Sequence, residues 1–489
     1  MFFRDLLRGF SLQNRRPSPV VVGPRTKGVW PLDRPMLELS PGDVFTIRDC
    51  VTGIQIFGAS GSGKTSGSLS LLAQTMLRDG WGMLVLTTKP GEADQWVKWA
   101  QANGRGPDVL RIRPDGTQHF NFLDYLNHHP DPGAAIATNI GDMLMTLAQH
   151  AKPKASATET STFFAESASQ MATQAIHLLR AAGESLTLPA ISRVINGAPN
   201  HPLELKEEDV EQRVVPQLLR QADERGSPQL DALCDYWLGQ FPNMNERTRG
   251  DVISTLTTVL FRFSEPPFDD LVASTRGSSY MPEMVDAGRV MILDCPVINY
   301  QLAGRLFQIA MKHLVQQAIL RRPTVDTTRP VAIIADEAQN FVTHADYAYQ
   351  AMCRDFRGCT VYATQTLDNY KEAVGSEAAV EALLASLVTK IFHANAGRTN
   401  EWAQKLIAGD WRTMHSDSLN QRGGEGKSTM GLTQSESIQP QVLASEFTRL
   451  RNGGSRNGGL VDGIVFQPGR LFRQTGKPHL RVTFAQCGR

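Results

Sequence analysis

The sequence lacks a net charge of either sign and lacks any long apolar run. Its 50 lysines and arginines balance 49 aspartates and glutamates, so the formal net charge at pH 7 is +1. This balance does not indicate nucleic-acid binding and does not exclude it, because a ring-shaped motor can confine its positive charge to a pore. No stretch approaches the ~18 apolar residues of a membrane-spanning helix, and no signal peptide is recognisable. We expect no transmembrane segment and a cytoplasmic location, with peripheral attachment to the inner membrane left open.

Closely spaced cysteines are also missing. Six cysteines occur singly along the chain, without the CxxC pair that would indicate a zinc site or a disulfide framework. Reduced thiols in the cytosol are the simplest interpretation. With 489 residues, of which 41% are hydrophobic and 20% charged, the chain has the composition of a globular protein with two or three domains.

Basic residues are concentrated at the N-terminus. Residues 1–28 contain six lysines and arginines and one acid, Asp5, so their local charge is 6 − 1 = +5. Phe3, Leu6, Leu7 and Phe10 fall on one helical face, which predicts a basic amphipathic helix over residues 1–12. Such a helix can lie on an anionic membrane, dock on a partner or pack on its own domain, and the sequence leaves these alternatives open.

The most informative stretch is Gly58–Thr65, which reads Gly-Ala-Ser-Gly-Ser-Gly-Lys-Thr. It follows the apolar run Ile54–Phe57 and precedes residues Ser68–Leu77, which have helical spacing. A strand, a glycine-rich turn and a helix in this order are the context of a phosphate-binding P-loop, whose backbone N–H groups point at the phosphates. The predicted nucleotide ligands are Gly58, Ala59, Ser60, Gly61, Ser62, Gly63, Lys64, Thr65 and Ser66.

Two of these residues have side chains with distinct expected roles. Lys64 is expected to reach the phosphates as a point charge, and Thr65 to place its hydroxyl on Mg²⁺. A P-loop alone indicates nucleotide binding rather than hydrolysis. The sequence therefore predicts ATP and Mg²⁺ as cofactors, and the case for hydrolysis depends on residues elsewhere.

Two consecutive carboxylates supply that case. The apolar run Val331–Ala335 ends in Asp336 and Glu337. Ligands of parallel α/β sheets sit at the carboxyl ends of the strands, so we expect both carboxylates in the site. Asp336 is predicted to hold Mg²⁺, directly or through water, and Glu337 to orient and deprotonate the attacking water.

A sensor and an arginine complete the predicted chemistry. The next apolar strand, Thr360–Ala363, leads to Gln365, whose amide can bond both the γ-phosphate and the water. An arginine on the helix before that strand can face the nucleotide of a neighbouring subunit and stabilise the transition state. The candidates are Arg354, Arg357 and, further along the chain, Arg398, each with a surface arginine as the alternative.

The alternation of elements predicts an α/β fold: a RecA-like, doubly wound, mostly parallel sheet carrying the P-loop, with an inserted all-α domain. Residues 133–262 show helical periodicity with little strand signal, and strands resume at Val290–Leu293. We predict an N-terminal segment (1–28), a first nucleotide-binding part (29–125), the all-α domain (126–284) and a second nucleotide-binding part (285–489). Within the last, the polar, glycine-rich residues Ser416–Pro440 predict a mobile loop.

The order of these motifs resembles the FtsK/HerA branch of P-loop ATPases, and most closely the soluble ATPase part of type IV secretion coupling proteins, which serve conjugative DNA transfer. The resemblance is carried by Gly58–Thr65, by Lys89-Pro90-Gly91-Glu92, by Asn121-Phe122-Leu123-Asp124 with Phe163, Phe164 and Glu166, and by Asp336-Glu337-Ala338 with Arg354 eleven residues before Gln365. It runs through most of residues 50–410.

The resemblance implies a hexameric ring that pumps DNA through a central pore with ATP, with protein partners bound by the all-α domain. It implies Lys64, Glu337, Gln365 and Arg354 as catalytic residues, Arg354 acting in trans. Two departures stand out. The usual transmembrane anchor is replaced by the basic segment of residues 1–12, and the motif around Lys89 lacks the family's aspartate, with Thr88 near its place. Lys89 and Glu92 therefore receive no role.

Three functions fit these patterns. The leading hypothesis is an ATP-driven DNA translocase or coupling ATPase, with Arg262–Arg276 and Gln421–Lys427 as candidate pore loops. The second is an ATP-dependent platform that recruits proteins through the all-α domain, as a secretion receptor or an anti-phage defence component. The third is a nucleotide-binding subunit that scarcely hydrolyses, against which the complete Asp336-Glu337 pair argues.

Overall fold

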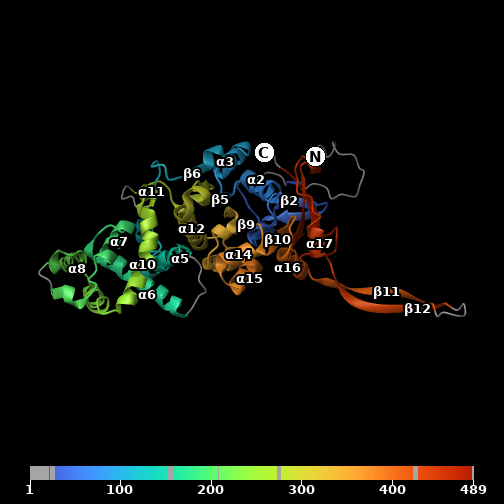
Figure 1. Ribbon diagram of the computed structural model, residues 1–489. Helices are drawn as coiled ribbons and strands as arrows, with labels where there is room; N and C mark the ends of the chain where they lie inside the picture. Colours follow the sequence, from blue (N-terminus) through green and yellow to red (C-terminus); the bar gives the residue numbers. More distant parts are fainter. Residues whose placement is uncertain are drawn as a thin grey trace. The chain divides into compact units, whose positions relative to one another are not determined.

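The computed structural model describes residues 21–22, 28–151, 159–206, 209–272, 277–421 and 428–486 (Figure 1). The predicted amphipathic helix of residues 1–12 lies outside the described residues. The chain forms two compact units: residues 1–79, 359–370 and 384–489 make the first, and residues 80–358 and 371–383 the second. No helix in the described part of the chain is long and apolar enough to cross a bilayer.

The first unit contains five strands of the main sheet, in the order β14-β13-β10-β4-β9. The P-loop strand β4 (Ile54–Phe57) pairs in parallel with β9 (Gly358–Thr364) and with β10 (Thr389–Phe392). The C-terminal strands β13 (Leu460–Phe466) and β14 (His479–Ala485) extend this sheet antiparallel beyond β10. Every residue of β4 is buried, as expected for a central strand covered on both faces.

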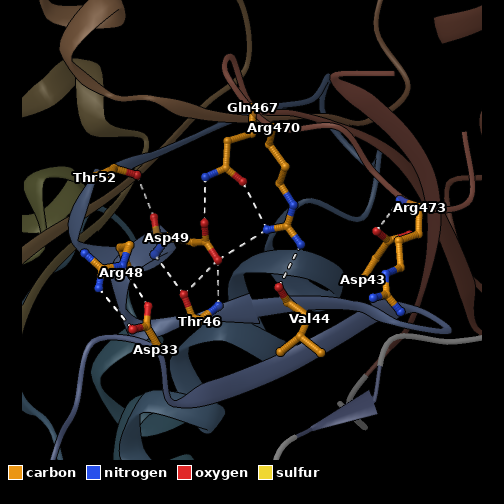
Figure 2. A network of polar contacts seen from close by, with 10 residues as sticks. All are labelled: Asp33, Asp43, Val44, Thr46, Arg48, Asp49, Thr52, Gln467, Arg470 and Arg473. Atoms are coloured by element: carbon orange, nitrogen blue, oxygen red, sulfur yellow. Dashed lines mark hydrogen bonds and ion pairs between the residues drawn. The ribbon is translucent and has the colours of Figure 1, made fainter. Parts of the chain in front are cut away.

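A network of hydrogen bonds and ion pairs joins residues 33–52, which precede β4, to residues 467–473, which follow β13 (Figure 2). Asp49 lies in the short helix α1 (Ile47–Val51) and caps it by accepting hydrogen bonds from Thr46 N and Thr46 Oγ1, at 2.7 and 2.9 Å. It also accepts from Gln467 Nε2 at 2.8 Å and from Arg470 Nη1 at 3.2 Å. Arg470 Nη2 donates to Val44 O at 2.7 Å, so one arginine holds both α1 and the strand before it. These contacts fix the segment that leads into β4.

Residues Ser416–Pro440 differ from the predicted mobile loop. β11 (Gly409–Gln421) and β12 (Ser428–Pro440) form a two-stranded antiparallel hairpin, paired from Gly409 with Pro440 to Gln421 with Ser428. Figure 1 draws it as two long paired arrows. The described part of this stretch, residues 416–421 and 428–440, is therefore extended and paired. The prediction was wrong because it followed glycine content over the whole stretch.

The second unit contains four strands in the order β8-β5-β7-β6, all parallel. Their bounds are β8 (Val331–Asp336), β5 (Gly82–Leu86), β7 (Val290–Leu293) and β6 (Val109–Ile112). β5, β7 and β8 are buried throughout, which explains their continuous apolar sequences. β8 and β7 match the apolar runs Val331–Ala335 and Val290–Leu293 that the sequence predicted.

Helices join and flank these strands. α2 (Ser70–Arg78) continues the helical segment after the P-loop, α3 (Glu92–Ala102) follows β5, and α12 (Val297–Arg321) connects β7 to β8. α13 (His344–Met352) separates β8 from β9. The remaining bounds in this part of the fold are β2 (Pro35–Ser40), β3 (Asp43–Thr46), α14 (Leu367–Val374), α15 (Glu377–Ser386), α16 (Arg398–Ile407) and α17 (Ala444–Phe447).

A helical region without strands in its described residues occupies the chain between β6 and β7. Its principal helices are α4 (Phe122–Asn127), α5 (Ala137–Ala151), α6 (Glu159–Ala182), α7 (Leu188–Asn196), α8 (Val214–Glu224), α9 (Leu230–Cys234), α10 (Glu246–Ser264) and α11 (Phe268–Val272). Met171, Ile176 and Leu179 of α6 are fully buried, as its amphipathic pattern predicted. The predicted boundaries of this region, 126 and 284, remain predictions.

Candidate functional site

The P-loop lies at the carboxyl end of β4, between two neighbouring parallel strands. Gly58 N donates to Thr364 O of β9 at 3.2 Å, and Ala59 N donates to Ala394 O, just after β10, at 3.0 Å. Ser62 N donates to Ala59 O at 3.0 Å and closes the turn. The chain becomes helical at Thr65, first in a π-helical segment (Thr65–Leu69) and then in α2. The predicted strand, turn and helix are thus confirmed.

Three glycines are required for steric reasons. Gly61 and Gly63 have φ angles of 74° and 86°, in the left-handed region that favours glycine. A Cβ on Gly63 would come within 2.6 Å of Val461 Cγ2, and one on Gly58 within 2.4 Å of Ser62 Oγ. Larger residues would push the turn open, so these glycines keep its backbone tightly curled.

The polar side chains of the turn have different surroundings. Lys64 is 6% exposed, whereas Thr65 is exposed at the start of the helix. Ser62 is 3% exposed, and its hydroxyl has no hydrogen-bond partner among the described residues. A buried hydroxyl without a partner costs free energy, which a ligand that accepts or donates a hydrogen bond there would recover.

His393 supports the P-loop helix and was not predicted from the sequence. It is fully buried just after β10. Its Nδ1 lies 2.8 Å from Asp462 O and its Nε2 lies 2.7 Å from Ser68 Oγ. A carbonyl oxygen only accepts, so Nδ1 carries the hydrogen and Nε2 accepts from the Ser68 hydroxyl. Burial lowers the pKa of His393 to about 4, which keeps this ring neutral at physiological pH.

Gln365 follows β9 directly, as predicted, and its backbone is held by the loop after β10. Asn395 Nδ2 donates to Gln365 O at 2.6 Å, and Asn400 Nδ2 donates to Asn395 O at 2.7 Å. Leu367 N donates to Thr399 Oγ1 at 3.0 Å. Since β9 pairs with β4, the structure brings Gln365 and the P-loop together at one edge of the sheet.

The predicted carboxylates lie at the end of β8 in the second unit. Asp336 is 8% exposed and Glu337 is 4% exposed. Glu337 has φ 54° and ψ 48°, a left-handed conformation that is rare for a residue with a side chain. Glu337 N donates to Asp336 Oδ1 at 3.0 Å, and Asn340 Nδ2 donates to Glu337 O at 3.0 Å. Strain of this kind is concentrated at functional sites.

The turn after β5 surrounds these carboxylates, although the sequence assigned it no role. Lys89 Nζ lies 3.5 Å from Glu337 Oε1, and Thr88 Oγ1 donates to Asp336 O at 3.3 Å. Burial alone would lower the pKa of Lys89, but the charges of Asp336, Glu337 and Glu92 raise it above its ordinary value. Lys89 is therefore charged and neutralises part of the acidic cluster.

Glu92 has a second structural role in this turn. Its Oε2 accepts from Thr88 N at 2.7 Å and from Lys89 N at 3.1 Å. Burial raises the pKa of Glu92 to about 6, helped by the charge of Asp336 and opposed by these two hydrogen bonds. The carboxylate thus shapes the backbone that presents Lys89.

A buried network holds the segment that follows Glu337. Lys312 of α12 and Asp346 of α13 are both buried and form an ion pair. Lys312 Nζ also donates to Phe341 O at 2.7 Å, and Gln316 Nε2 donates to Asp346 Oδ1 at 2.7 Å. From the helical region, His150 Nε2 lies 3.1 Å from Val342 O. Two successive carbonyls are thereby tied to two different helices.

The candidate arginines are placed differently from the prediction. α13 ends at Met352, so Arg354 and Arg357 lie in the turn before β9 and not on the helix. Arg354 is exposed there, as a residue that acts on another subunit would need to be. Arg357 is 5% exposed and lies 3.6 Å from Asp326, which favours a structural role. Arg398 begins α16 and lies 3.5 Å from Asp368.

The candidate pore loops fall partly outside the described residues. Arg262–Arg276 contains the end of α10 and the short helix α11, and its residues 273–276 are not described. Of Gln421–Lys427, Gln421 alone is described, as the last residue of β11. The described residues contain no cluster of three or more His, Cys, Asp or Glu side chains arranged to hold a metal ion on their own.

Residues 283–462 match the family model described as the type IV secretion-system coupling protein DNA-binding domain. A comparison with curated protein sequences gives no match.

Solved structures resemble nearly the whole chain. "Bacterial conjugative coupling protein TrwBdeltaN70", in its unbound monoclinic form, is similar with a TM-score of 0.60 and 13% identity, over 97% of this chain and 96% of that chain. Plasmid coupling protein TrwB with the ATP analogue ADPNP gives 0.56 and 12%, over 98% of both chains. The same protein with ADP and Mg²⁺ gives 0.57 and 12%, over 97% and 95%. The chain therefore has the fold of these coupling proteins, a doubly wound α/β sheet with a helical region, and the predicted resemblance to type IV secretion coupling proteins is confirmed.

Proposed function

We propose that this chain is a DNA-translocating coupling ATPase, which hydrolyses ATP at the subunit interfaces of a ring to move DNA. The match of residues 283–462 to the DNA-binding domain of coupling proteins carries the proposal, because this segment includes Asp336, Glu337 and Gln365. The likeness in fold over nearly the whole chain supports it. Near-neutral net charge requires that the phosphate-binding lysines and arginines be concentrated in a few loops.

ATP with Mg²⁺ is the proposed nucleotide, and the residues present fit it. The glycines of Gly58–Gly63 curl the backbone, the buried Ser62 hydroxyl is available for a phosphate oxygen, and Thr65 lies at the start of the helix that follows. Similar coupling proteins hold an ATP analogue in one structure and ADP with Mg²⁺ in another. Bound Mg²⁺ would neutralise charge on the phosphate oxygens during hydrolysis.

Each side chain of the proposed site has a separate role in ATP hydrolysis. Lys64 binds the phosphates, and Thr65 and Asp336 are the proposed metal ligands. Glu337 orients a water and takes its proton as the oxygen attacks the γ-phosphorus, while the bond to the bridging oxygen of ADP breaks. Gln365 reports whether the γ-phosphate is present, and the exposed Arg354 stabilises the transition state on a neighbouring subunit.

We add Lys89 to this proposed set. Its ammonium lies 3.5 Å from Glu337 Oε1, and Gln339 Nε2 donates to Glu337 Oε2 at 3.0 Å. Both contacts hold the two carboxylate oxygens of Glu337 in place. Lys89 therefore acts as a positioning residue for Glu337.

The remaining assignments concern partners and location. We propose that the helical region binds protein partners, that the chain forms a hexameric ring, and that it works in the cytoplasm with residues 1–12 as a docking segment for the inner membrane or a partner. The contact between His150 and Val342 offers a path by which a partner on the helical region influences the segment after Glu337.

Steady-state ATP hydrolysis with and without single- and double-stranded DNA, at low and moderate salt, tests the proposal. Lys64→Ala is the inactive variant, and Lys405→Ala, a change at an exposed lysine on α16, is its matched control. The proposal requires DNA stimulation that weakens as salt rises, because phosphate contacts release counterions. Equal hydrolysis with and without DNA would overturn it and favour the protein-recruiting platform.

A further inference from the structure

The contact between Gln486, just after β14, and the P-loop residue Ser66 is not explained by the proposed chemistry. Gln486 follows β14, and its Nε2 donates to Ser66 Oγ at 2.6 Å. Ser66 is the last of the predicted nucleotide ligands, and its side chain is half-buried in the first turn of the helix after the P-loop. Residues 420 positions apart thus meet at the turn that holds the phosphates.

The orientation of the Gln486 amide is set by its other partner. Gly454 N donates to Gln486 Oε1 at 2.7 Å. A backbone N–H is only a donor, so the atom facing Gly454 must be the oxygen and the atom facing Ser66 must be the nitrogen. Gln486 therefore donates to Ser66 and does not accept from it.

This direction determines what the Ser66 hydroxyl can do. Its oxygen accepts from Gln486, and this is the single hydrogen bond of its side chain among the described residues. The hydroxyl hydrogen is left to be donated to an acceptor outside the protein, and a phosphate oxygen is such an acceptor. An acceptor at position 486 would draw the same hydrogen away.

The loop that carries Gly454 is shaped to hold this amide. Gln486 N donates to Gly459 O at 2.8 Å, which fixes the backbone next to the side chain. Gly453 and Gly454 have φ angles of 78° and 74°, where glycine is favoured. A Cβ on Gly453 would come within 2.5 Å of the Gln486 carboxamide carbon. Glycine at position 453 thus leaves the space that the amide occupies.

We propose that Gln486 is a positioning residue of the nucleotide site, which presents the Ser66 hydroxyl hydrogen to the phosphate chain of the bound nucleotide. This inference rests on the proposed function, because it assumes that the P-loop binds ATP. It makes phosphate binding depend on the C-terminal end of the chain, which also touches the P-loop where Val461 packs against Gly63.

The test is titration of purified full-length protein with ATP and Mg²⁺, together with the rise in unfolding temperature that the nucleotide causes. Gln486→Ala should weaken ATP binding about 3- to 10-fold, the effect of losing one hydrogen bond. Gln486→Glu should weaken it more, because a carboxylate accepts the Ser66 hydrogen and adds negative charge beside the phosphates. Gln474→Ala, at an exposed glutamine of the same unit, is the matched control.

A double-mutant cycle separates this role from a structural one. If Gln486 acts through Ser66, Gln486→Ala should add little to the effect of Ser66→Ala on ATP affinity. Unchanged ATP affinity in Gln486→Ala, equal effects of Ala and Glu at this position, or fully additive effects with Ser66→Ala would overturn the inference. Absence of ATP binding by the unmodified protein, or binding that Lys64→Ala leaves intact, would instead overturn the proposed function.

Discussion

The Nε2 atom of His393 accepts a hydrogen bond from Ser68 Oγ over 2.7 Å, across 325 positions of sequence. The same ring donates from Nδ1 to Asp462 O at 2.8 Å. One buried, neutral imidazole therefore connects the helix after the P-loop to β13. The position of that helix on the sheet therefore depends on a residue outside the P-loop.

Replacement of His393 by alanine should destabilise the fold by about 2–4 kcal/mol, because it creates a cavity and leaves two buried polar groups unpaired. The pKa of His393 is lowered from 6.5 to about 4, so the unfolded chain binds the extra proton between these values. Stability from this residue is present above about pH 6.5 and is lost as pH falls toward 4, by up to about 3 kcal/mol.

Urea unfolding at pH 7 and at pH 5 measures both effects. Between pH 7 and pH 5 the free energy of unfolding should fall more for the unmodified protein than for His393→Ala. The difference in free energy of unfolding between these two proteins should therefore be smaller at pH 5 than at pH 7. Ser68→Ala removes one hydrogen bond without removing the titrating ring and serves as the control. An equal difference between the unmodified protein and His393→Ala at both pH values would contradict the assigned protonation state.

Lys312 and Asp346 form a fully buried ion pair that fixes the segment after Glu337. Lys312→Met should cost about 3–5 kcal/mol, because it leaves a buried carboxylate without a counter-charge. Lys312→Met combined with Asp346→Leu should recover much of this loss. The exposed pair of Lys371 with Glu377 offers a contrast, and Lys371→Ala should change stability by less than about 1 kcal/mol.

Chemical denaturation of the three variants provides the measurement. A double variant as unstable as Lys312→Met would show that other contacts of Asp346, such as the one from Gln316 Nε2, dominate.

Parts of the site were predictable because their residues are close in sequence. The glycines and Lys64 lie in eight consecutive residues, and the strand before them is apolar except for Gln55. Asp336 and Glu337 follow a buried strand in the same way. In these stretches the local residue pattern is consistent with the position of the residues in the fold. The strand, the turn and the position of the charged residue can therefore be predicted from the sequence.

Other parts depend on contacts between distant residues, which a single sequence does not reveal. Nothing local distinguishes His393 or Gln486 from other polar residues near a strand end. Lys89 stands in a motif that departs from the family pattern, and its pairing with Glu337 spans 248 positions. The hairpin of β11 and β12 was missed for a different reason: the prediction followed the polar and glycine content of the whole stretch.

Glu92 predicts a pH dependence of the opposite sign to that of His393. Its pKa is raised from 4.5 to about 6, so the folded state binds the proton more tightly than the unfolded chain. Stability from this residue is therefore present below about pH 4.5 and is lost as pH rises through 6, by about 1–2 kcal/mol. Glu92→Gln keeps an oxygen that accepts from Thr88 N and removes the titration. The free energy of unfolding of Glu92→Gln should rise relative to that of the unmodified protein as pH increases from 4.5 to 7. Urea midpoints measured across this pH range test this. A constant difference between the two proteins at all pH values would refute the raised pKa.

Glu337 separates hydrolysis from nucleotide binding. Glu337→Gln keeps the size of the side chain but removes the base, so ATP turnover should fall by about 10²–10⁴-fold. Its carboxylate is assigned no part in holding the phosphates, so the dissociation constant for ATP should stay within about twofold. Phosphate release and ATP titration measure the two quantities, and Glu401→Gln, at an exposed position on α16, is the matched control. Normal turnover by Glu337→Gln would remove Glu337 from the mechanism. Tight binding without turnover by the unmodified protein would instead identify the chain as a nucleotide-binding subunit that scarcely hydrolyses.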